Sequence, residues 1–499
     1  MTRRPASTPG ANWAPLSLLL ILGAITLLRL AAAAVIPLTE DEAYYRLWAL
    51  HPQFGYFDHP PMVAWWIHAG MAIAGDNPLG VRLIPCLSCL VTSLLAFDLA
   101  RQLGCDEAAC ARAAIWCNAT LLIGAGGLLA IPDAAAVPFW TLALCCVART
   151  RTSDASAWWI AAGAAAGLAC LSKYSALFLA PGVALWLVAR AEGLSELRKR
   201  GPWIAALVAA LIFSANVMWN AGHHWVSFVK QFGRVAPGRI DPRFELELIL
   251  GQFLLLNPFI TVFVLRAIAG RKPGAAQARP DLSLILVTSA PFAFYLVLHA
   301  LHDRVQAHWP VPLYPALAIA AAAAAGREPL GRALRTARAL AAPFGLGLAA
   351  VGLLHAALPS TDLRKGDPAD PLRGWPEFAA QVEADRQAQG AAWIGTLSYG
   401  VTGQLAAQNR IQAPVFELIE RDRYAMDAAS PPADAARPGL VVDLERRATA
   451  AKLSSCFAQV QPLKSLARGR SASHDSRYAV FLVSGPRVAV LSSGCPPTP

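Results

Sequence analysis

Residues 13–36 read WAPLSLLLILGAITLLRLAAAAVI, an apolar run whose one charged side chain is Arg29. A helix of about 20 apolar residues can cross the hydrocarbon core of a bilayer. The run is too long for the apolar core of a signal peptide, and no small-residue cleavage site follows it. We therefore predict a membrane-spanning helix near the start of the chain.

Ten further apolar runs predict an all-α polytopic protein with about 11 transmembrane helices. They lie at roughly 79–100, 113–131, 134–148, 157–171, 174–189, 202–219, 245–265, 282–300, 310–325 and 339–358. The apolar segment 61–74 is shorter, and its Trp65 and Trp66 suit the headgroup level. We predict that this segment is an interfacial helix rather than a span.

The composition of the 499 residues agrees with this class, because 56% are hydrophobic, only 15% are charged and the mean hydropathy is +0.43. These values exclude a disordered chain, a coiled coil, a collagen-like repeat and an ordinary soluble enzyme. Ten cysteines are too sparse for a disulfide scaffold. Cys86 and Cys89 have CxxC spacing but lie in an apolar run, so we interpret them as packing thiols.

The net charge of +11 is consistent with the predicted arrangement of spans and loops. If the N-terminus is cytoplasmic, the cytoplasmic segments hold 18 Lys and Arg residues and the opposite loops hold 7. Basic residues concentrate on the cytoplasmic side of membrane proteins. We therefore predict a multi-pass protein of the cytoplasmic (inner) membrane with its C-terminal region on the periplasmic side. We therefore interpret the basic residues as a signal of membrane orientation and not as a nucleic-acid-binding surface.

From about residue 359 the sequence becomes more polar, and no apolar run reaches spanning length. We predict a transmembrane domain at 1–358 and a small soluble extracytoplasmic α/β domain at 359–499. Its expected elements are a helix at 375–389 and strands at 391–396, 439–443 and 478–483. Cys456 and Cys495 could pair outside the cytoplasm, or could remain two free thiols.

The first outer loop, within 37–78, carries the most informative residues: Thr39-Glu40-Asp41-Glu42, and later Asp58-His59 before a Pro-Pro pair. A helix start with Thr39 as N-cap and acids in the first turn would explain part of this pattern. It would not explain the Asp-His-Pro-Pro turn or the aromatic density around both acids. We therefore predict a functional role for this loop.

Further polar residues mark the outer ends of the spans. They are Arg29, Arg82, Asp133, Lys173, Tyr174, His299, His302, Asp303, Arg304 and His308. Ionisable residues at membrane depth are costly and tend to line a site, although Arg29 and Arg82 could instead snorkel. Basic groups would hold a lipid phosphate, while a carboxylate would accept a proton or steady an oxocarbenium-like centre. Apolar grooves between helices would hold a lipid tail.

At this point the ordered motifs resemble the GT-C membrane glycosyltransferases of the family 39 and protein O-mannosyltransferase type. The bacterial branch includes the lipid A aminoarabinose transferase and the galacturonosyltransferases. The matching pieces are 41–45 (DEAYY), 55–61 (GYFDHPP), 131–134 (IPDA), 168–174 (LACLSKY), 219–220 (WN), 224–225 (HW), 231–234 (QFGR) and 309–315 (WPVPLYP).

The resemblance implies an inverting enzyme that moves a sugar from a polyprenyl-phosphate donor to a lipid, glycan or protein acceptor on the outer face. It implies that Asp41 is the general base and that Asp58 lies in the active site, so both are predicted to be catalytic. It also suggests Lys173 as a partner of the donor phosphate. The predicted substrate-binding residues are Glu42, Tyr45, His59, Arg82, Asp133, Lys173, Tyr174, Arg304 and His308.

Aminoarabinose transferases carry a Glu-Lys pair before Pro-Pro, whereas this chain has Asp58-His59. Histidine provides a weaker fixed positive charge at neutral pH, which argues against aminoarabinose as the donor sugar. Some relatives use a divalent metal, and Asp41, Glu42 and Asp58 are the residues that could ligate one. The sequence does not demand a metal.

Two other classes remain as alternatives. A polytopic transporter or lipid-linked-sugar flippase would more often show inverted repeats and spans broken near the midplane. A structural membrane protein would leave the acidic loop unexplained. The concentration of ionisable residues on one face favours the transferase.

Overall fold

The computed structural model describes residues 14–151, 156–233, 239–270, 280–358, 367–424, 436–469, 476–487 and 494–495. The chain divides into two compact units. The helical unit comprises residues 1–33, 82–214 and 235–351, and the mixed unit comprises residues 34–81, 215–234 and 352–499. The first outer loop therefore belongs to the same unit as the polar C-terminal region.

Among the described residues, five helices are long and apolar enough to cross a membrane. They are α1 (Ala14–Val35), α4 (Pro78–Gln102), α10 (Arg200–Gly222), α14 (Ser283–Ala300) and α16 (Arg332–Ala357). Two bent pairs raise this number to seven if each counts as one span. The first joins α5 (Glu107–Asn118) to α6 (Leu121–Gly124) and η1 (Gly126–Leu128), and the second joins α12 (Pro242–Leu255) to α13 (Pro258–Ala269).

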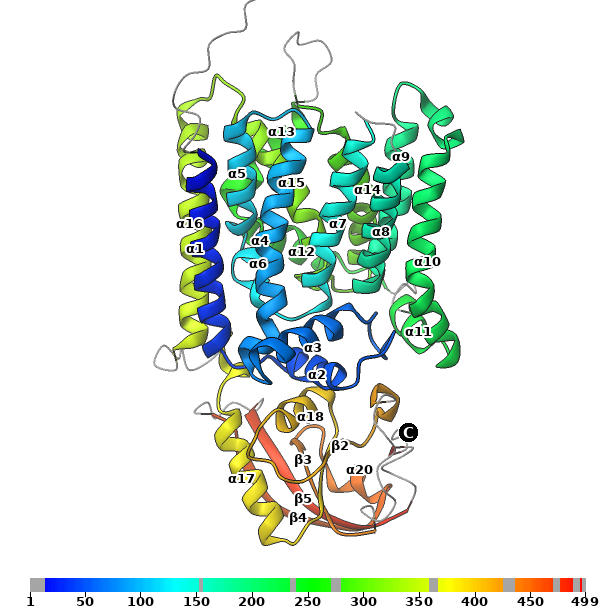
Figure 1. Ribbon diagram of the computed structural model, residues 1–499. Helices are drawn as coiled ribbons and strands as arrows, with labels where there is room; N and C mark the ends of the chain where they lie inside the picture. Colours follow the sequence, from blue (N-terminus) through cyan, green and yellow to red (C-terminus); the bar gives the residue numbers. More distant parts are fainter. Residues whose placement is uncertain are drawn as a thin grey trace, which may run out of the picture. The chain divides into compact units, whose positions relative to one another are not determined.

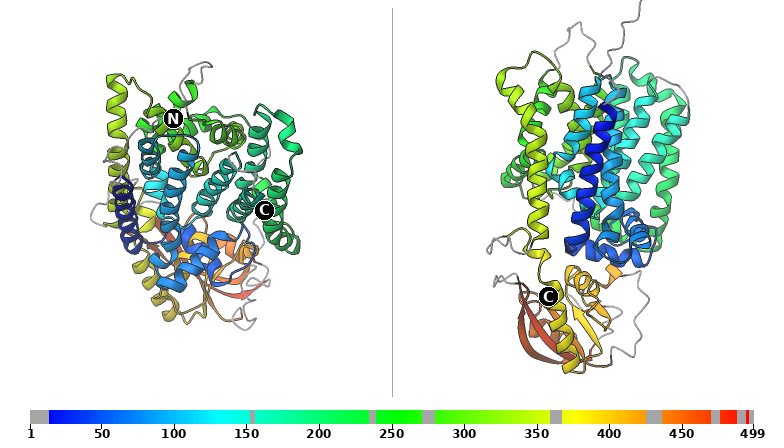
Figure 2. Two further views of the ribbon diagram at one scale, coloured as in Figure 1. Left: turned by 45° about the horizontal axis from the view of Figure 1, so that its top comes forward. Right: turned by 60° about the vertical axis from the view of Figure 1, so that its left-hand side comes forward.

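The remaining predicted spans coincide with other helices. These are α7 (Pro132–Arg149), α8 (Ser156–Ser172), η2 (Tyr174–Phe178) with α9 (Leu179–Val188), and η5 (Val311–Leu313) with α15 (Tyr314–Ala325). Most helices of the helical unit run roughly parallel or antiparallel to one another (Figures 1 and 2). The structure thus has the helices of a multi-pass membrane protein.

The α12–α13 pair departs from the continuous helix expected over 245–265, because it bends by 107°. Asn257, at the bend, has φ of +80° and is followed by Pro258. Its side-chain amide donates to the carbonyl oxygens of Ala119 (3.1 Å) and Ala341 (2.7 Å), and its Oδ1 accepts from Phe259 N (3.1 Å). Contacts to two distant segments therefore fix the bend, and an apolar run alone does not reveal them.

Arg29 of α1 is only 1% exposed and does not snorkel. Its Nη2 donates to Asn118 Oδ1 (3.1 Å) and to the carbonyl oxygens of Ile123 (2.9 Å) and Gly124 (3.3 Å). These carbonyls lie just beyond α5, where the chain bends by 70°. Arg29 therefore satisfies backbone groups that a broken helix leaves open inside a membrane protein.

The core of the helical unit is built around α15, whose sequence YPALAIAAAAAA is almost entirely buried. It packs against α5 and α13. Small side chains let helix backbones approach closely, and this is how helices associate when lipid removes most of the hydrophobic driving force.

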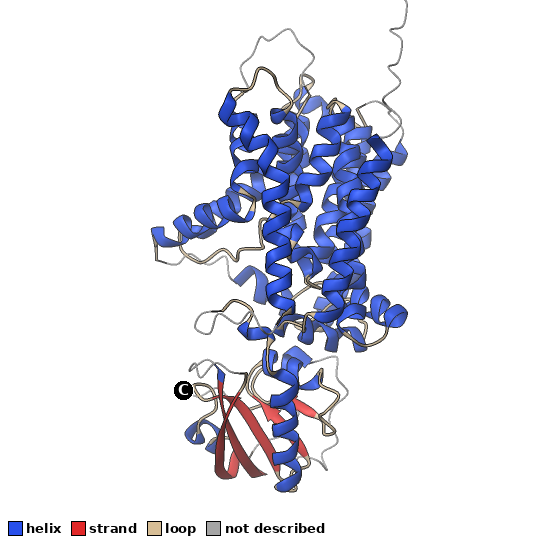
Figure 3. Cartoon of the chain, turned by 90° about the vertical axis from the view of Figure 1, so that its left-hand side faces the viewer, coloured by secondary structure: helices blue, strands red, loops and turns tan. Residues whose placement is uncertain are grey.

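The mixed unit contains a five-stranded sheet within its described residues, in the order β2-β1-β3-β5-β4 (Figure 3). The strands are β1 (Trp393–Thr396), β2 (Val415–Glu417), β3 (Gly439–Leu444), β4 (Phe457–Ala467) and β5 (Arg477–Pro486). β1 is parallel to β2 and β3, whereas β5 is antiparallel to β3 and β4. The predicted strands at 439–443 and 478–483 lie within β3 and β5, and the one predicted at 391–396 is shorter, since β1 begins at Trp393.

Both faces of the central strand β3 are buried. Leu440 and Val442 pack in one cluster with α17 (Trp375–Ala388), while Val441 packs on the other side in the cluster that includes Phe457. This alternation is the period of two that a strand imposes. The predicted helix at 375–389 corresponds to α17.

A disulfide joins Cys456 and Cys495, with their Cα atoms 5.5 Å apart. The backbone N–H of Cys495 donates to the carbonyl oxygen of Leu418 (2.5 Å), just after β2. Of the two alternatives for these cysteines, the structure therefore contains the paired one. The disulfide ties Cys495 to Cys456, just before β4, and the hydrogen bond ties it to Leu418, just after β2.

Candidate active site

The acidic segment of the first outer loop begins helix α2 (Glu40–Leu50). Thr39 is its N-cap: Thr39 Oγ1 accepts from Glu42 N (3.2 Å), and Glu42 Oε2 accepts from Thr39 N (2.9 Å). This capping box satisfies two helix-end donors and gives the buried Glu42 a structural task. The helix-start interpretation therefore accounts for Thr39 and Glu42, and it leaves Asp41 available for another role.

Asp41 is half-buried and accepts a hydrogen bond at Oδ1 from the hydroxyl of Tyr399 (3.0 Å). Tyr399 is the first residue of α18 (Tyr399–Ala406), directly after β1. Burial, followed by the neighbouring charge of Asp41, raises the pKa of Tyr399. The hydroxyl therefore stays protonated and can donate its hydrogen bond to the Asp41 carboxylate.

The turn before Tyr399 is held by Asp443 at the end of β3. Asp443 Oδ2 accepts from Leu397 N (2.7 Å) and from Ser398 Oγ (2.9 Å). Gly403 then lets α18 lie against α2, because a Cβ there would come within 2.7 Å of Tyr44 N. The position of the Tyr399 hydroxyl thus depends on the sheet and on a close contact between two helices.

Asp58 lies in the turn before α3 (Met62–Ala74) and is 8% exposed. Its Oδ2 accepts from the hydroxyl of Tyr44 (3.1 Å) and is ion-paired with Arg423 Nη1. Its backbone oxygen accepts from Gln231 Nε2 of α11 (Val226–Phe232; 2.7 Å). Two segments far apart in the sequence therefore hold the carboxylate, and a third holds the backbone of the same residue.

Aromatic rings surround both acids of the loop. Tyr44 packs against Tyr399 with ring centroids 4.9 Å apart, and Trp48 stacks on Tyr56 at 4.5 Å. Tyr45 is buried in the same helix, and its ring centroid lies 6.2 Å from that of the half-buried His59. Because these aromatic rings form a largely apolar environment, the electrostatic interactions between the carboxylates and their partners are stronger than in water.

A second polar cluster lies in the helical unit, where Asp133 occupies the first turn of α7. Lys173 Nζ is 2.6 Å from Asp133 Oδ1, and His308 Nε2 is 3.6 Å from Asp133 Oδ2. Lys173 also lies 5.9 Å from the ring centroid of Trp309. A small cavity of about 60 Å³ borders Asp133 and His308, so this cluster has space beside it.

The other predicted binding residues have varied surroundings. Tyr174 is buried at the start of η2, next to Lys173. Arg82 is fully buried in α4 and donates to the carbonyl oxygen of Ala33 (3.4 Å). Arg304 is exposed and forms two hydrogen bonds with Glu247 of α12 (2.7 and 3.0 Å). Arg82 and Arg304 thus each have a protein partner.

The residues suggested as metal ligands do not form a ligand set. Glu42 belongs to the capping box, and Asp58 is paired with Arg423. No group of three or more His, Cys, Asp or Glu side chains in the described ranges is arranged to hold a metal ion.

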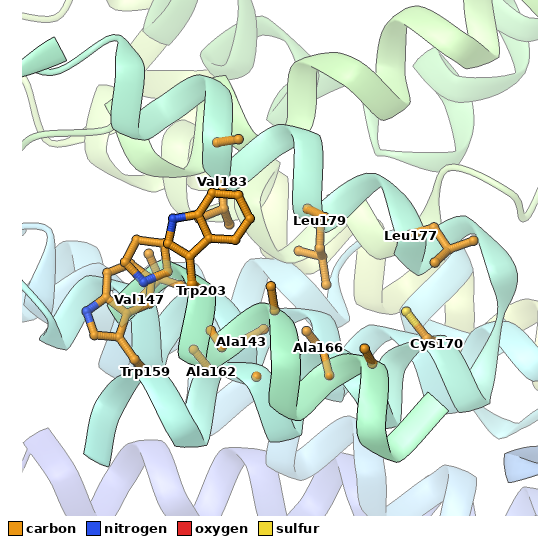
Figure 4. A pocket seen from close by; sticks show the side chains of 18 of the residues that line it. Ala143, Val147, Trp159, Ala162, Ala166, Cys170, Leu177, Leu179, Val183 and Trp203 are labelled. Carbon is orange, nitrogen blue, oxygen red and sulfur yellow. The ribbon is translucent and has the colours of Figure 1, made fainter. Parts of the chain in front are cut away.

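An apolar cavity of about 430 Å³ lies between α7, α8, α9 and α10 (Figure 4). Small side chains such as Ala162 and Ala166 widen it on the α8 side, and Trp159, Trp203 and Val183 border it. Its volume is in the range of small-molecule pockets. Its lining suits a hydrocarbon chain.

Sequence reasoning missed Tyr399 and Arg423, the C-terminal partners of Asp41 and Asp58. The run Glu420-Arg421-Asp422-Arg423-Tyr424 is a dense charge cluster with an aromatic residue, which could have drawn attention to Arg423. Tyr399 carries no comparable signal, because a tyrosine at the start of a short helix is unremarkable.

Three comparisons bear on the family. The Dolichyl-phosphate-mannose-protein mannosyltransferase family matches residues 58–219. The lipid A galacturonosyltransferase RgtD of Rhizobium johnstonii is 28% identical over 285 residues, which are 55% of this chain and 58% of RgtD. The match thus spans little more than half of that relative's length.

Among solved structures, the fold is similar to that of ArnT from Cupriavidus metallidurans. The crystal structure bound to undecaprenyl phosphate gives a TM-score of 0.66 at 17% identity, over 95% of this chain and 99% of ArnT. The apo structure gives 0.62 at 17% identity, over 96% and 99%. The two sequence matches are both to glycosyltransferases, and the chain shares the fold of ArnT.

Proposed function

We propose that the protein is an inverting glycosyltransferase that moves a sugar from a polyprenyl-phosphate donor to an acceptor at the outer face of the cytoplasmic membrane. The observation that carries this proposal is Asp41, a half-buried carboxylate at the start of α2 that is held by the protonated hydroxyl of Tyr399. A carboxylate placed in this way can accept a proton from an attacking group.

In the proposed reaction, the acceptor hydroxyl attacks the anomeric carbon of the donor sugar. The new bond forms between the acceptor oxygen and this carbon, and the bond from this carbon to the phosphate oxygen breaks. Asp41 takes the proton of the hydroxyl, and the electron pair leaves with polyprenyl phosphate. Attack opposite the leaving group inverts the anomeric centre.

Asp58 takes a different part, because Arg423 balances its charge. An ion-paired carboxylate is a weaker proton acceptor, so Asp58 is assigned to orienting substrate hydroxyls together with His59 and Tyr45. Lys173 is assigned to the donor phosphate, with Asp133, His308 and Tyr174 arranged around it. Lysine is a suitable point charge for phosphate. Glu42, Arg82 and Arg304 are weaker candidates, since they already have protein partners.

The names of the relatives favour a lipid acceptor of the lipid A type over a protein acceptor. RgtD is named as a lipid A galacturonosyltransferase. The apolar cavity of about 430 Å³ supports a lipid substrate, because its lining suits a hydrocarbon tail. The matching relatives are named as transferases, and nothing among them supports the transporter or flippase alternative.

We also propose eleven spans, with residues 1–358 as the membrane domain and residues 359–499 as an extracytoplasmic α/β domain. Helices or bent helix pairs at all eleven predicted positions support the count. The Cys456–Cys495 disulfide supports the location of the tail, since disulfides persist in oxidising compartments.

Mass spectrometry of membrane lipids and surface glycans tests the function. The comparison uses cells with the parental chain, cells without it, and cells carrying Asp41→Asn at an equal membrane level. The parental cells should contain one species heavier by one sugar residue, and the other two should lack it. Identical lipids and glycans in all three would contradict the proposal.

A further inference from the structure

Arg423 is a buried cation in the C-terminal region, only 7% exposed, in the short helix η8 (Arg421–Tyr424). Its guanidinium carbon lies 4.8 Å from the ring centroid of Phe57 and 4.9 Å from that of Tyr399. An arginine between two rings is restricted in orientation and gains cation–π stabilisation. Phe57 directly precedes Asp58, and Tyr399 is the residue that donates to Asp41.

The same guanidinium joins two carboxylates. Nη1 pairs with Asp58 Oδ2, and Nε donates to Glu420 Oε2 (2.6 Å). Lys230 of α11 lies 3.8 Å from Glu420 Oε1 and 5.3 Å from the ring centroid of Phe57. Charged groups from η8, α11 and the first outer loop thus form one network around Arg423.

The helix η8 is itself anchored to the sheet. Glu417 at the end of β2 accepts from the backbone N–H groups of Ile419 (3.0 Å) and Glu420 (2.5 Å). The Cys456–Cys495 disulfide and the bond from Cys495 N to Leu418 O hold the same segment. A functional side chain is positioned well when its own support is fixed in this way.

We propose that Arg423 is a positioning residue of the acidic site, supplied by the C-terminal region to fix the Asp58 carboxylate. This inference rests on the proposed glycosyltransferase function. It gives the tail a task in the reaction, because Arg423 and Tyr399 both come from it. Arg423 acts through Asp58 and does not touch the substrate.

Asp58 is held by groups from two segments. The Tyr44 hydroxyl of α2 donates to its Oδ2, and Arg423 of η8 pairs with the same oxygen. Without Arg423, the carboxylate should lose the contact that fixes its orientation.

The test uses the purified full chain in lipid vesicles with a polyprenyl-phosphate sugar as donor. Arg423→Gln should lower kcat by about 10- to 100-fold with little change in the KM for the donor, since a misplaced group costs up to about 100-fold. Arg423→Lys keeps the charge and should recover part of kcat.

Arg421→Gln is the matched control, because Arg421 lies in the same short helix with its guanidinium 5.8 Å from the ring centroids of Phe416 and Tyr424. It should keep the parental kcat and the parental KM for the donor. In an Asp58→Asn background, Arg423→Gln should lower kcat little further, because the effects of two coupled residues on the rate are not additive. Parental kinetics for Arg423→Gln, or additive losses in the double variant, would overturn the proposal.

Thermal unfolding of the same four chains (parental, both single variants and the double variant) separates this proposal from the function itself. Coupling between Asp58 and Arg423 in the unfolding midpoints should appear whether or not transfer is seen. If the four unfolding midpoints show coupling but the parental chain transfers no sugar, the proposed function is wrong, and the positioning role in catalysis is wrong with it. If the parental chain transfers sugar and no coupling appears, only the positioning role is wrong.

Discussion

The two acidic clusters of the molecule are built in opposite ways. Asp133 meets Lys173, 40 residues away, within the helical unit. Asp41 and Asp58 meet Tyr399 and Arg423, which are 358 and 365 residues away within the mixed unit. One cluster is assembled from helices of the helical unit, and the other joins the segment 37–78 to the sheet-bearing C-terminal region.

The partners differ as much as their distances in sequence. A cation pairs with Asp133 and with Asp58, whereas the hydroxyl of Tyr399 donates to Asp41. A carboxylate held by a hydroxyl can act as a base, while a carboxylate–cation pair is better suited to holding charged substrate groups. On this account Asp41 acts in the chemical step, and Lys173 acts in binding the donor.

Asp41→Asn gives the largest expected effect on this comparison. The amide cannot accept the proton, so kcat should fall by about 100- to 10,000-fold, the range for a lost general base. Steady-state transfer kinetics in vesicles would measure it, and circular dichroism would show that the variant is folded. A kcat near the parental value would assign the base elsewhere.

Lys173→Gln should weaken the donor's phosphate contact and lower kcat/KM by roughly 10- to 100-fold, as expected for a hydrogen bond to a charged group. The control is Lys173→Gln combined with Asp133→Asn, which removes the buried pair without leaving an unpaired charge. If Lys173 only neutralises Asp133, the double variant should regain activity. If Lys173 binds phosphate, it should not.

Gly403→Ala tests whether the contact between α18 and α2 positions Tyr399. The new Cβ would meet the backbone of Tyr44, which should cost about 1–3 kcal/mol of stability. Gly400→Ala is the control, because its Cβ would meet the flexible side chain of Glu40. Thermal unfolding should show the larger loss for Gly403→Ala, and equal losses would refute the close-contact explanation.

Cys456→Ser should have the smallest effect on transfer, because it acts only through the support of η8. Loss of the disulfide should lower the free energy of unfolding by about 2–4 kcal/mol. Chemical denaturation of the parental protein with and without reductant would measure it. A stability insensitive to reductant would show that the bond does not brace the tail.

The sequence predicted the positions of the helices well, because apolar runs of spanning length report burial in lipid directly. It could not predict the bend at Asn257, which depends on carbonyl groups of Ala119 and Ala341 far along the chain. β4 was missed because its residues are mostly exposed and lack apolar alternation, and β2 has only three residues.

The candidate site shows the same division. Asp41 and Asp58 could be recognised from an acidic, aromatic-rich loop next to a span. Tyr399 and Arg423 could not be assigned to them, because only the folded mixed unit brings residues so distant in sequence together. Glu42 has the same acidic chemistry as Asp41, and the structure shows that it closes the capping box with Thr39.

Transfer rates at saturating polyprenyl-phosphate sugar, measured side by side for Asp41→Asn and Lys173→Gln, test the division of labour most directly. The account predicts that Lys173→Gln recovers most of its rate as donor is raised, whereas Asp41→Asn stays slow at every donor concentration. Recovery of Asp41→Asn at high donor, with a persistently slow Lys173→Gln, would contradict it.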